Sequence, residues 1–188
     1  VKAIVTAGNA TLGLSGGTVI NKGDITLVGG VYNDGTNKYG SVGLVAQDNG
    51  SITSTSGIIN ISVDGVESAG LFAQDGTLDL EKANITTTGG AFNTFSTGSA
   101  GIIKLGLDSV LNTGNKSLAF YTDNGGKIEF TGPLAGAPGS VIANIAGSTN
   151  SNDRGTAFYY VSSTPHGTFD QTAVSAWNTS TFNGTLNN

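Results

Sequence analysis

The sequence predicts an all-β fold, a right-handed parallel β-helix of about seven coils, and two observations lead to it. The first is composition. The 188 residues include 30 Gly and no Met, with only 8 Lys plus Arg and 13 Asp plus Glu. Long helices would lack both intrinsic propensity and charge pairing in such a chain. The second is a short apolar unit that recurs along the chain, and a narrow solenoid core accommodates such units.

The recurring unit is clearest in two segments, SVGLVAQDNGSI from Ser41 and SAGLFAQDGTLDL from Ser68, which start 27 residues apart. Weaker copies begin at Ser99, Ser117 and Gly155, at further offsets of 31, 18 and 38 residues. A single copy leaves its backbone donors and acceptors open on both sides. We therefore expect the copies to stack as successive coils whose strands pair in parallel.

Each copy contains a small residue, then Gly or Ala, a large apolar residue, a turn and a second alternating strand. The large residues expected to lie in one column are Leu44, Leu71, Ile102, Phe120 and Phe158. After the turn, period-two alternation places Ile52, Leu78, Leu80, Ile128 and Phe130 inside, and Lys127 and Glu129 outside. The Ser99 copy is irregular, because alternation from Ile102 would point Lys104 inward, and we expect a bulge or register shift there.

Turn residues mark the corners between strands. Positive φ angles are expected within Asp48-Asn49-Gly50, Asp75-Gly76 and Asp123-Asn124-Gly125, with further corners at Asp34-Gly35, Asp64-Gly65 and Gly89-Gly90. Further strands are expected over residues 25–28, 58–63, 84–86 and 141–145, and side loops over 93–98 and 148–155. The whole chain, 1–188, is expected to be one β-helical segment of a larger protein, with a weaker repeat and a loop or end-cap region over 146–188.

Charge and cysteine content exclude several functions. A net charge of −5, a pI near 4.5 and a single arginine, Arg154, disfavour nucleic acid as a partner. No apolar run is long enough to span a bilayer and no export signal follows Val1, so we expect a soluble fragment without direct membrane insertion. The absence of cysteine removes thiol catalysis, disulfides and cysteine-based metal sites.

The acidic corners suggest one candidate metal site. Asp48, Asp75 and Asp123 would line one edge of the rod if they occupy equivalent places, and carboxylate oxygens bind Ca²⁺. The glycine-rich nonapeptide of calcium β-rolls is missing, however, and turn chemistry alone explains these residues. The sequence therefore assigns no metal and no cofactor.

Catalytic residues are not predicted either. The only histidine, His166, lies between Pro165 and Gly167 with Asp153 and Asp170 near in sequence, which is typical of an exposed loop residue. Glycan lyases and hydrolases on parallel β-helices need convergent carboxylates, and lyases add Lys or Arg. Here the acids occur mostly in glycine turns and the basic residues are dispersed. We expect no enzyme activity.

Aromatic residues gather late in the chain, at Phe158, Tyr159, Tyr160, Phe169, Trp177 and Phe182. Alternation places Phe158 and Tyr160 inside and Tyr159 outside. These residues suit an end cap or a packed loop, and the alternatives are a stacking platform for sugar or a docking patch for protein. Hydroxyl runs such as Thr86-Thr87-Thr88 lack the regular Thr-x-Thr spacing that an ice-binding helix requires.

The blocks SVGLVAQDNGSI and SAGLFAQDGTLDLEKANITTTGG resemble the passenger region of type V autotransporters, particularly the large adhesins of anaerobic Gram-negative bacteria and the vacuolating-toxin-like group. The resemblance covers residues 41–130. It implies a signal peptide upstream, an outer-membrane barrel downstream, and a location at the bacterial cell surface or in the medium.

From this resemblance we expect a non-catalytic structural and adhesive segment that extends and displays binding regions. The expected partners are a host or bacterial cell-surface protein or glycan, and the neighbouring β-helix coils of the full-length chain. Two alternatives remain open: a toxin-type passenger that oligomerises and inserts in membranes, and a glycan-binding β-helix module.

Overall fold

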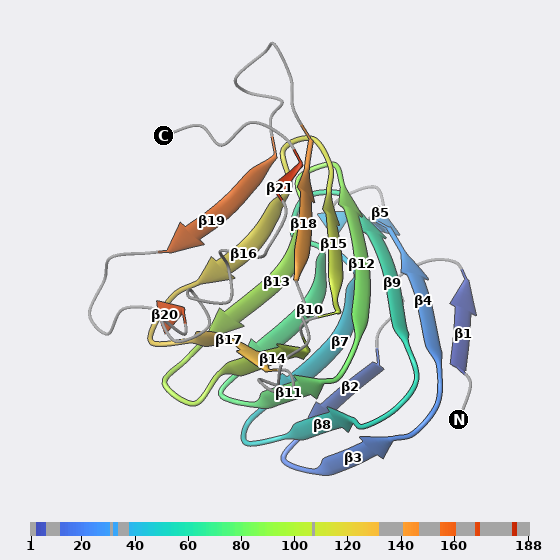
Figure 1. Cartoon of the computed structure of the whole chain (residues 1–188), viewed down its shortest axis with the longest axis vertical. Helices are drawn as coiled ribbons and strands as arrows, with labels where there is room; N and C mark the ends of the chain where they lie inside the picture. The colour runs from blue at the N-terminus through green and yellow to red at the C-terminus, as the bar shows by residue number, and fades with distance from the viewer. Residues whose placement is uncertain are drawn as a thin grey trace.

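The computed structural model describes residues 3–6, 12–30, 32–33, 38–106, 108–131, 141–146, 155–160, 168–169 and 182–183. These residues form strands and turns without any helix, and the strands build three parallel sheets that stack as a β-solenoid (Figure 1). The prediction of an all-β parallel solenoid is confirmed. Its right-handed sense and its number of coils stay predictions.

Three sheets form the walls of the solenoid. Sheet A contains β1 (Ala3–Thr6), β4 (Ile25–Gly29), β9 (Ile59–Asp64), β12 (Ala83–Thr88), β15 (Val110–Thr113), β18 (Ile142–Ile145) and β21 (Phe182–Asn183). Sheet B contains β2 (Leu12–Ser15), β7 (Val42–Gln47), β10 (Ala69–Gln74), β13 (Phe92–Thr97), β16 (Leu118–Thr122) and β19 (Thr156–Tyr160). Sheet C contains β3 (Thr18–Asn21), β8 (Ser51–Ser54), β11 (Thr77–Leu80), β14 (Ile102–Gly106), β17 (Lys127–Thr131) and β20 (Thr168–Phe169).

The chain visits sheets A, B and C in turn, and we call each such passage a rung. Between β4 and β7 it adds a short antiparallel hairpin of β5 (Tyr32–Asn33) and β6 (Lys38–Tyr39). Every other strand pairs in parallel with the strand of the same sheet in a neighbouring rung. Because the strands stack in register, residues at equivalent positions of successive rungs become neighbours.

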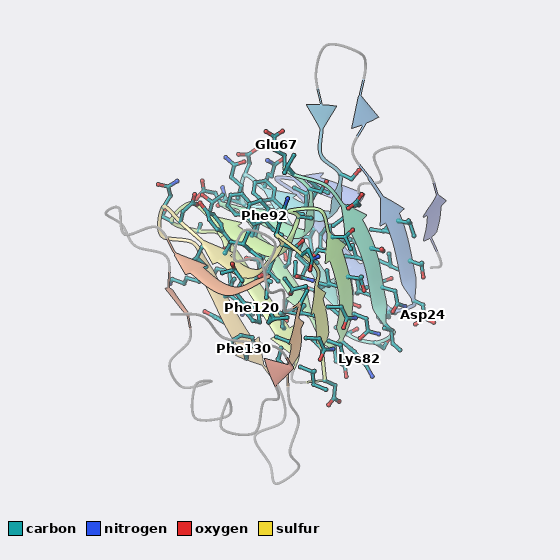
Figure 2. The ribbon with its side chains drawn as sticks, turned by 90° about the horizontal axis from the view of Figure 1, so that it is seen from above. Asp24, Glu67, Lys82, Phe92, Phe120 and Phe130 are labelled. Carbon is teal, nitrogen blue, oxygen red and sulfur yellow. The ribbon has the colours of Figure 1, made fainter. Side chains whose placement is uncertain are left out.

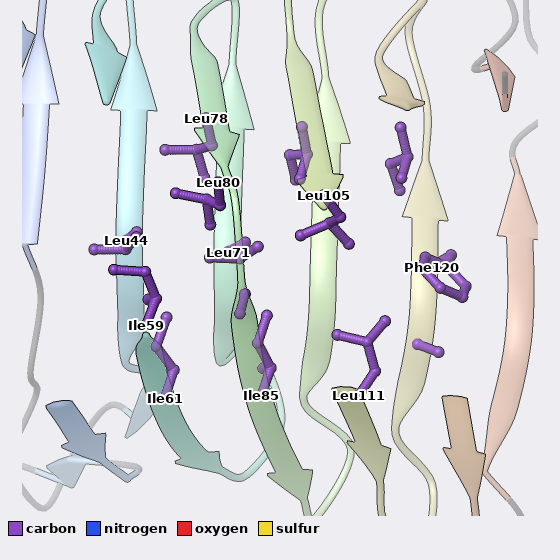
Figure 3. Close-up of a cluster of buried hydrophobic side chains, with 14 of the residues drawn as sticks. Leu44, Ile59, Ile61, Leu71, Leu78, Leu80, Ile85, Leu105, Leu111 and Phe120 are labelled. Atoms are coloured by element: carbon purple, nitrogen blue, oxygen red, sulfur yellow. The ribbon is translucent and has the colours of Figure 1, made fainter. Parts of the chain in front are cut away.

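The core runs along the axis between the three sheets. Alternation directs one side of each strand inward, as in β9, where Ile59, Ile61 and Val63 are buried. On sheet B, Leu44 is the register partner of Leu71, and both are fully buried (Figure 3). The stacking on which the sequence prediction depended is therefore confirmed for these two copies.

One predicted side loop is a strand of sheet B. Residues 93–98 were expected to bulge from the rod, but β13 covers Phe92–Thr97 and puts Thr94 in the column of Leu71 and Phe120. Sequence analysis missed this copy because a hydroxyl replaces the large apolar side chain. Thr94 is compatible with burial because its Oγ1 donates to the carbonyl of Ala119 at 2.9 Å.

The expected irregularity near Ser99 is also wrong. Strand β14 alternates regularly with Ile103 and Leu105 buried, so Lys104 points outward and no bulge is needed. Ile102 lies on sheet C, where it pairs with Thr77 and Lys127, and it does not belong to the column of Leu71. The inward residues predicted after the turns, from Ile52 to Phe130, are buried as expected.

Left-handed backbone at the corners follows the turn residues closely. Positive φ occurs at Asp48 (52°), Asn49 (64°), Asp75 (51°), Asn124 (46°) and Gly125 (88°). Asp, Asn and Gly adopt this conformation more readily than other residues do. The corners at Gly65 and at Gly89-Gly90 are confirmed too, whereas Asp34-Gly35 lies outside the described residues.

Buried serines connect neighbouring rungs where sheet A turns into sheet B. Ser68 Oγ accepts a hydrogen bond from the backbone N–H of Ser41 at 3.0 Å and donates one to the carbonyl of Asp64 at 2.8 Å. A small hydroxyl residue at the start of a copy thus satisfies backbone groups that the corner would otherwise leave unpaired.

Candidate functional site

The outer faces of the three sheets differ in chemistry. Sheet C carries charged residues in register, with Asp79 beside Lys104 and Lys104 beside Glu129. The Nζ of Lys104 lies 4.0 Å from Oδ2 of Asp79. Sheet A carries mainly amides and hydroxyls, and sheet B carries aliphatic and aromatic side chains. Sheet B is the strongest candidate for a binding surface, because contiguous apolar groups on an outer face mark interaction sites.

Four rings form a continuous aromatic cluster on sheet B. Phe95 lies at the centre, with ring centroids 5.0 Å from Phe72, 5.2 Å from Phe92 and 4.6 Å from Tyr121. Phe92 also contacts Tyr121 at 5.2 Å. The interplanar angles, between 46° and 78°, describe tilted and edge-to-face contacts. All four rings remain partly exposed, so the cluster is stabilised internally and still presents ring surface outward.

Strand register produces this arrangement. Phe72, Phe95 and Tyr121 occupy equivalent positions on β10, β13 and β16, and Val45 precedes them on β7. Val42 and Leu118 flank this row on the side nearer sheet A. We call the partly exposed set of Val42, Val45, Phe72, Phe92, Phe95, Leu118 and Tyr121 the aromatic face. None of its members is charged.

Figure 2 places this face relative to the charged corners. Phe92 lies toward the Glu67 end of the sheet A strands, and Asp24 and Lys82 lie toward the opposite end of those strands. This placement follows from the chain path, since Glu67 lies in the turn between β9 and β10 whereas Asp24 and Lys82 come directly before β4 and β12.

A row of amides borders the aromatic face. Gln47 and Gln74 are register partners, and Gln47 Nε2 donates to Gln74 Oε1 at 2.8 Å. Within the described part of the chain, this bond uses one group of each amide, so Gln74 Nε2 and Gln47 Oε1 remain able to donate and accept. Thr97 continues the row on β13. The margin therefore offers neutral hydrogen-bonding groups beside the rings.

The outer face of sheet A is organised differently. Asn84 Nδ2 donates to Asn60 Oδ1 at 3.1 Å, Asn144 Nδ2 donates to Asn112 Oδ1 at 2.8 Å, and Asn112 Nδ2 lies 3.4 Å from Thr86 Oγ1. These are two short ladders across neighbouring rungs. A shallow hollow of about 290 Å³ adjoins the second ladder, lined by Thr86, Thr87, Thr88, Asn112, Thr113, Gly114, Asn144, Ile145 and Ala146.

A buried polar cluster joins sheets A and B from the inside. Asn93 is fully buried, and its Oδ1 accepts from the hydroxyls of Thr87 at 2.9 Å and Thr113 at 2.7 Å. Its Nδ2 donates to the carbonyls of Ile85 at 3.0 Å and Asn112 at 3.3 Å. All four hydrogen-bonding positions of the amide are used. Asn93 is therefore a structural residue, and its amide has no donor or acceptor left for a ligand.

The three acidic corners do not all occupy equivalent places, since Asp123 is out of line with the other two. Asp48 and Asp75 follow the paired residues Gln47 and Gln74. Asp123 follows Thr122, the partner of Ser96, and so aligns one position earlier, with Thr97. Asp75 also has a structural task, since its Oδ1 accepts from the N–H of Ala100 at 3.1 Å. No group of three or more His, Asp and Glu suited to a metal ion occurs among the described residues.

The structure describes only some of the candidate residues that the sequence analysis named beyond residue 150. His166, Asp153, Asp170, Arg154 and Trp177 lie outside the described residues. Strands β19, β20 and β21 continue the three sheets, and register places Phe158 opposite Phe120 and Tyr159 opposite Tyr121. The described backbone of Phe169 and Phe182 lies in β20 and β21. The side chains of these late aromatics also lie outside the described residues.

Sequence reasoning missed the aromatic face. The available signal was the residue directly after each column residue, which is Val45, Phe72, Phe95, Tyr121 and Tyr159 in the five strands of sheet B from β7 to β19. It was hidden because the β13 copy was not recognised, and without Phe95 the row is interrupted.

Fold and faces together define the class of protein as a parallel β-solenoid with one apolar outer face. No protein-family model, curated protein or solved structure matches the chain. None of the described residues belongs to a helix long and apolar enough to cross a membrane.

Proposed function

We propose that this chain is a non-catalytic structural and adhesive segment of a bacterial surface autotransporter passenger, exposed at the cell surface or secreted. The observation that carries the proposal is the uncharged aromatic face on a regular solenoid. A stacked rod separates its ends in space, and an exposed apolar patch provides a surface for contact. The partner is a cell-surface protein or glycan of a host or a bacterium.

Rung stacking supports the structural half of this proposal. Each rung pairs with its neighbours in all three sheets, as β10 does with both β7 and β13. A rung at the end of such a stack exposes unpaired backbone groups, so its natural partner is a further coil of the same longer chain.

The distribution of carboxylates supports the non-catalytic half. Glycoside hydrolysis requires two carboxylates that converge on one bond. Within the described ranges, Asp75 Oδ1 accepts from the N–H of Ala100 at its corner, and Asp79 lies beside Lys104 on sheet C. The described lysines are likewise spread over corners, the β5–β6 hairpin and sheet C, which suits neither an acidic sugar nor nucleic acid.

A binding assay with the labelled chain and whole cells tests the adhesive half. Replacing Phe72 and Phe95 by Thr should reduce binding about fivefold or more, because half-buried aromatic contacts dominate such surfaces. The matched control replaces Ile20 and Val28, which are 64% and 43% exposed on sheets C and A, by Thr. Control variants should bind as the unmodified chain does.

Three outcomes would contradict the proposal. Equal binding by both double variants would show that the aromatic face does not contribute to adhesion. Cleavage of a polysaccharide that disappears on changing one carboxylate would show an enzyme. Leakage of dye from liposomes caused by the chain would favour a toxin-type passenger.

A further inference from the structure

We propose that the aromatic face binds a neutral glycan, laid along the stack of rungs with its sugar rings against Phe72, Phe95 and Tyr121. This inference rests on the proposed adhesive function and specifies the ligand class. It follows from the repeat of the rings, the open amides beside them and the distribution of charge around them.

The repeat of the rings suits an extended glycan. Phe72, Phe95 and Tyr121 stand at equivalent positions on three neighbouring strands, which lie about 4.8 Å apart in a sheet. This spacing is close to the length that one pyranose ring adds to an extended chain. Successive sugars would therefore meet successive rings, with their apolar C–H faces packed on the aromatic surface.

The amide margin supplies the polar half of such a site. Gln47 lies two residues after Val45, and Gln74 two residues after Phe72, so amide and apolar side chains project from the same side of each strand. The pair leaves one donor, Gln74 Nε2, and one acceptor, Gln47 Oε1, available beside the rings. Sugar-binding surfaces combine an apolar floor with a few polar groups that fix orientation, and this arrangement provides both.

The charge on the glutamine margin disfavours an acidic ligand. The aromatic face has no charged member, and the corner beside the glutamines carries the carboxylates of Asp48 and Asp75, followed by Asp123 near Tyr121. A sialylated or sulfated glycan placed along this margin would be repelled. A neutral glycan encounters no such penalty.

The packing of the rings favours a glycan over a protein partner. Protein interfaces concentrate their affinity in anchors that enter well-packed pockets. Here the rings of Phe72, Phe92, Phe95 and Tyr121 pack against one another in tilted and edge-to-face contacts, as an extended row along the rod. A row of rings beside neutral donors and acceptors suits a linear chain of hydroxyl-bearing sugars.

An array of immobilised neutral, sialylated and sulfated oligosaccharides, including β-1,4-linked tetrasaccharides of glucose and of N-acetylglucosamine, tests the inference. We expect binding to neutral members and weaker binding to acidic ones. For the strongest neutral oligosaccharide, calorimetry should show about a tenfold loss of affinity in Phe95→Thr and about a threefold loss in Gln74→Ala. Val28→Thr and Asn60→Ala on sheet A are matched controls and should bind normally, and thermal unfolding verifies that every variant is folded.

Each contrary result has a definite meaning. The glycan site is overturned if the folded chain binds no oligosaccharide. It is also overturned if Phe95→Thr and Gln74→Ala both bind with the affinity of the unmodified chain. If cell binding depends on Phe95 but survives enzymatic removal of cell-surface glycans, the face binds a protein, which overturns this inference and leaves the adhesive function standing. If neither cells nor glycans bind, both proposals fall.

Discussion

Sheets A and B carry different kinds of side chain on their outer faces, although both are built by the same in-register parallel stacking. On sheet A, the amides of Asn60 and Asn84 bond each other, and Asn144 bonds Asn112. On sheet B, Phe72, Phe95 and Tyr121 pack edge to face, and their rings stay partly exposed. One outer face carries amides and hydroxyls that bond across rungs, whereas the other presents partly exposed aromatic rings beside a glutamine pair.

This difference shows that the residue type repeated at one position of the rung determines the chemical character of the whole outer face. Stacking in register makes each side chain the neighbour of its equivalent in the next rung. In the longer ladder of sheet A, Asn112 both donates to Thr86 and accepts from Asn144, so its side-chain amide is used on both sides. A ladder of aromatic rings gains contact energy but retains hydrophobic surface. The contrast between the faces therefore depends on correct rung register, which the interior must maintain.

The largest expected effect is the loss of stability in Asn93→Ala, because Asn93 links the two sheets whose register the faces require. The change removes four hydrogen bonds and leaves buried groups of Thr87, Thr113 and Ile85 without their partner. Each unsatisfied buried group costs about 1–3 kcal/mol, so we expect the free energy of unfolding to fall by roughly 3–5 kcal/mol. Urea denaturation followed by circular dichroism measures the change.

Thr97→Ala on the same strand is the control for Asn93→Ala. Its side chain is partly exposed on the outer margin of sheet B, and we expect a change within about 0.5 kcal/mol. A loss below about 1 kcal/mol in Asn93→Ala would mean that the polar cluster does not hold the two sheets together.

Much of the fold could be predicted from the sequence, for identifiable reasons. Leu44 and Leu71 lie in nearly identical segments, so their stacking follows from the repeat alone. The β13 strand was missed because Asn93 and Thr94 replace Gly and Leu of the repeat, and their burial depends on hydrogen-bond partners that include Thr113 and Ala119 of the next rung. Such partners are invisible to a search for apolar periodicity.

The candidate site was less predictable than the fold. An aromatic residue on the outer side of one strand is unremarkable in sequence, because single exposed apolar residues are common. Phe72, Phe95 and Tyr121 become a surface only when the register of three rungs is known. Irregular spacing, with Phe95 23 residues after Phe72 and Tyr121 26 residues after Phe95, hides that register.

An intermediate effect is expected for Phe95→Ala, which tests the aromatic face as a stabilising element. The variant loses three ring contacts, and we expect the free energy of unfolding to fall by about 2 kcal/mol. Phe95→Leu keeps most of the apolar area and should lose about half as much. Thermal and urea unfolding of both variants measure the difference, and equal losses would show that ring geometry contributes nothing beyond area.

The smallest effect is expected for Asn112→Ala, which shortens the longer amide ladder of sheet A. Asn112 keeps its backbone bond to Asn93, and the remaining groups of Thr86 and Asn144 lie on an outer face where water replaces the lost partner. We expect a loss of about 0.5–1 kcal/mol in urea unfolding. Binding to cells should be unchanged, because the polar ladder presents no apolar surface. A loss of cell binding in Asn112→Ala, with the protein still folded, would move adhesion from sheet B to sheet A and reverse the contrast between the two faces.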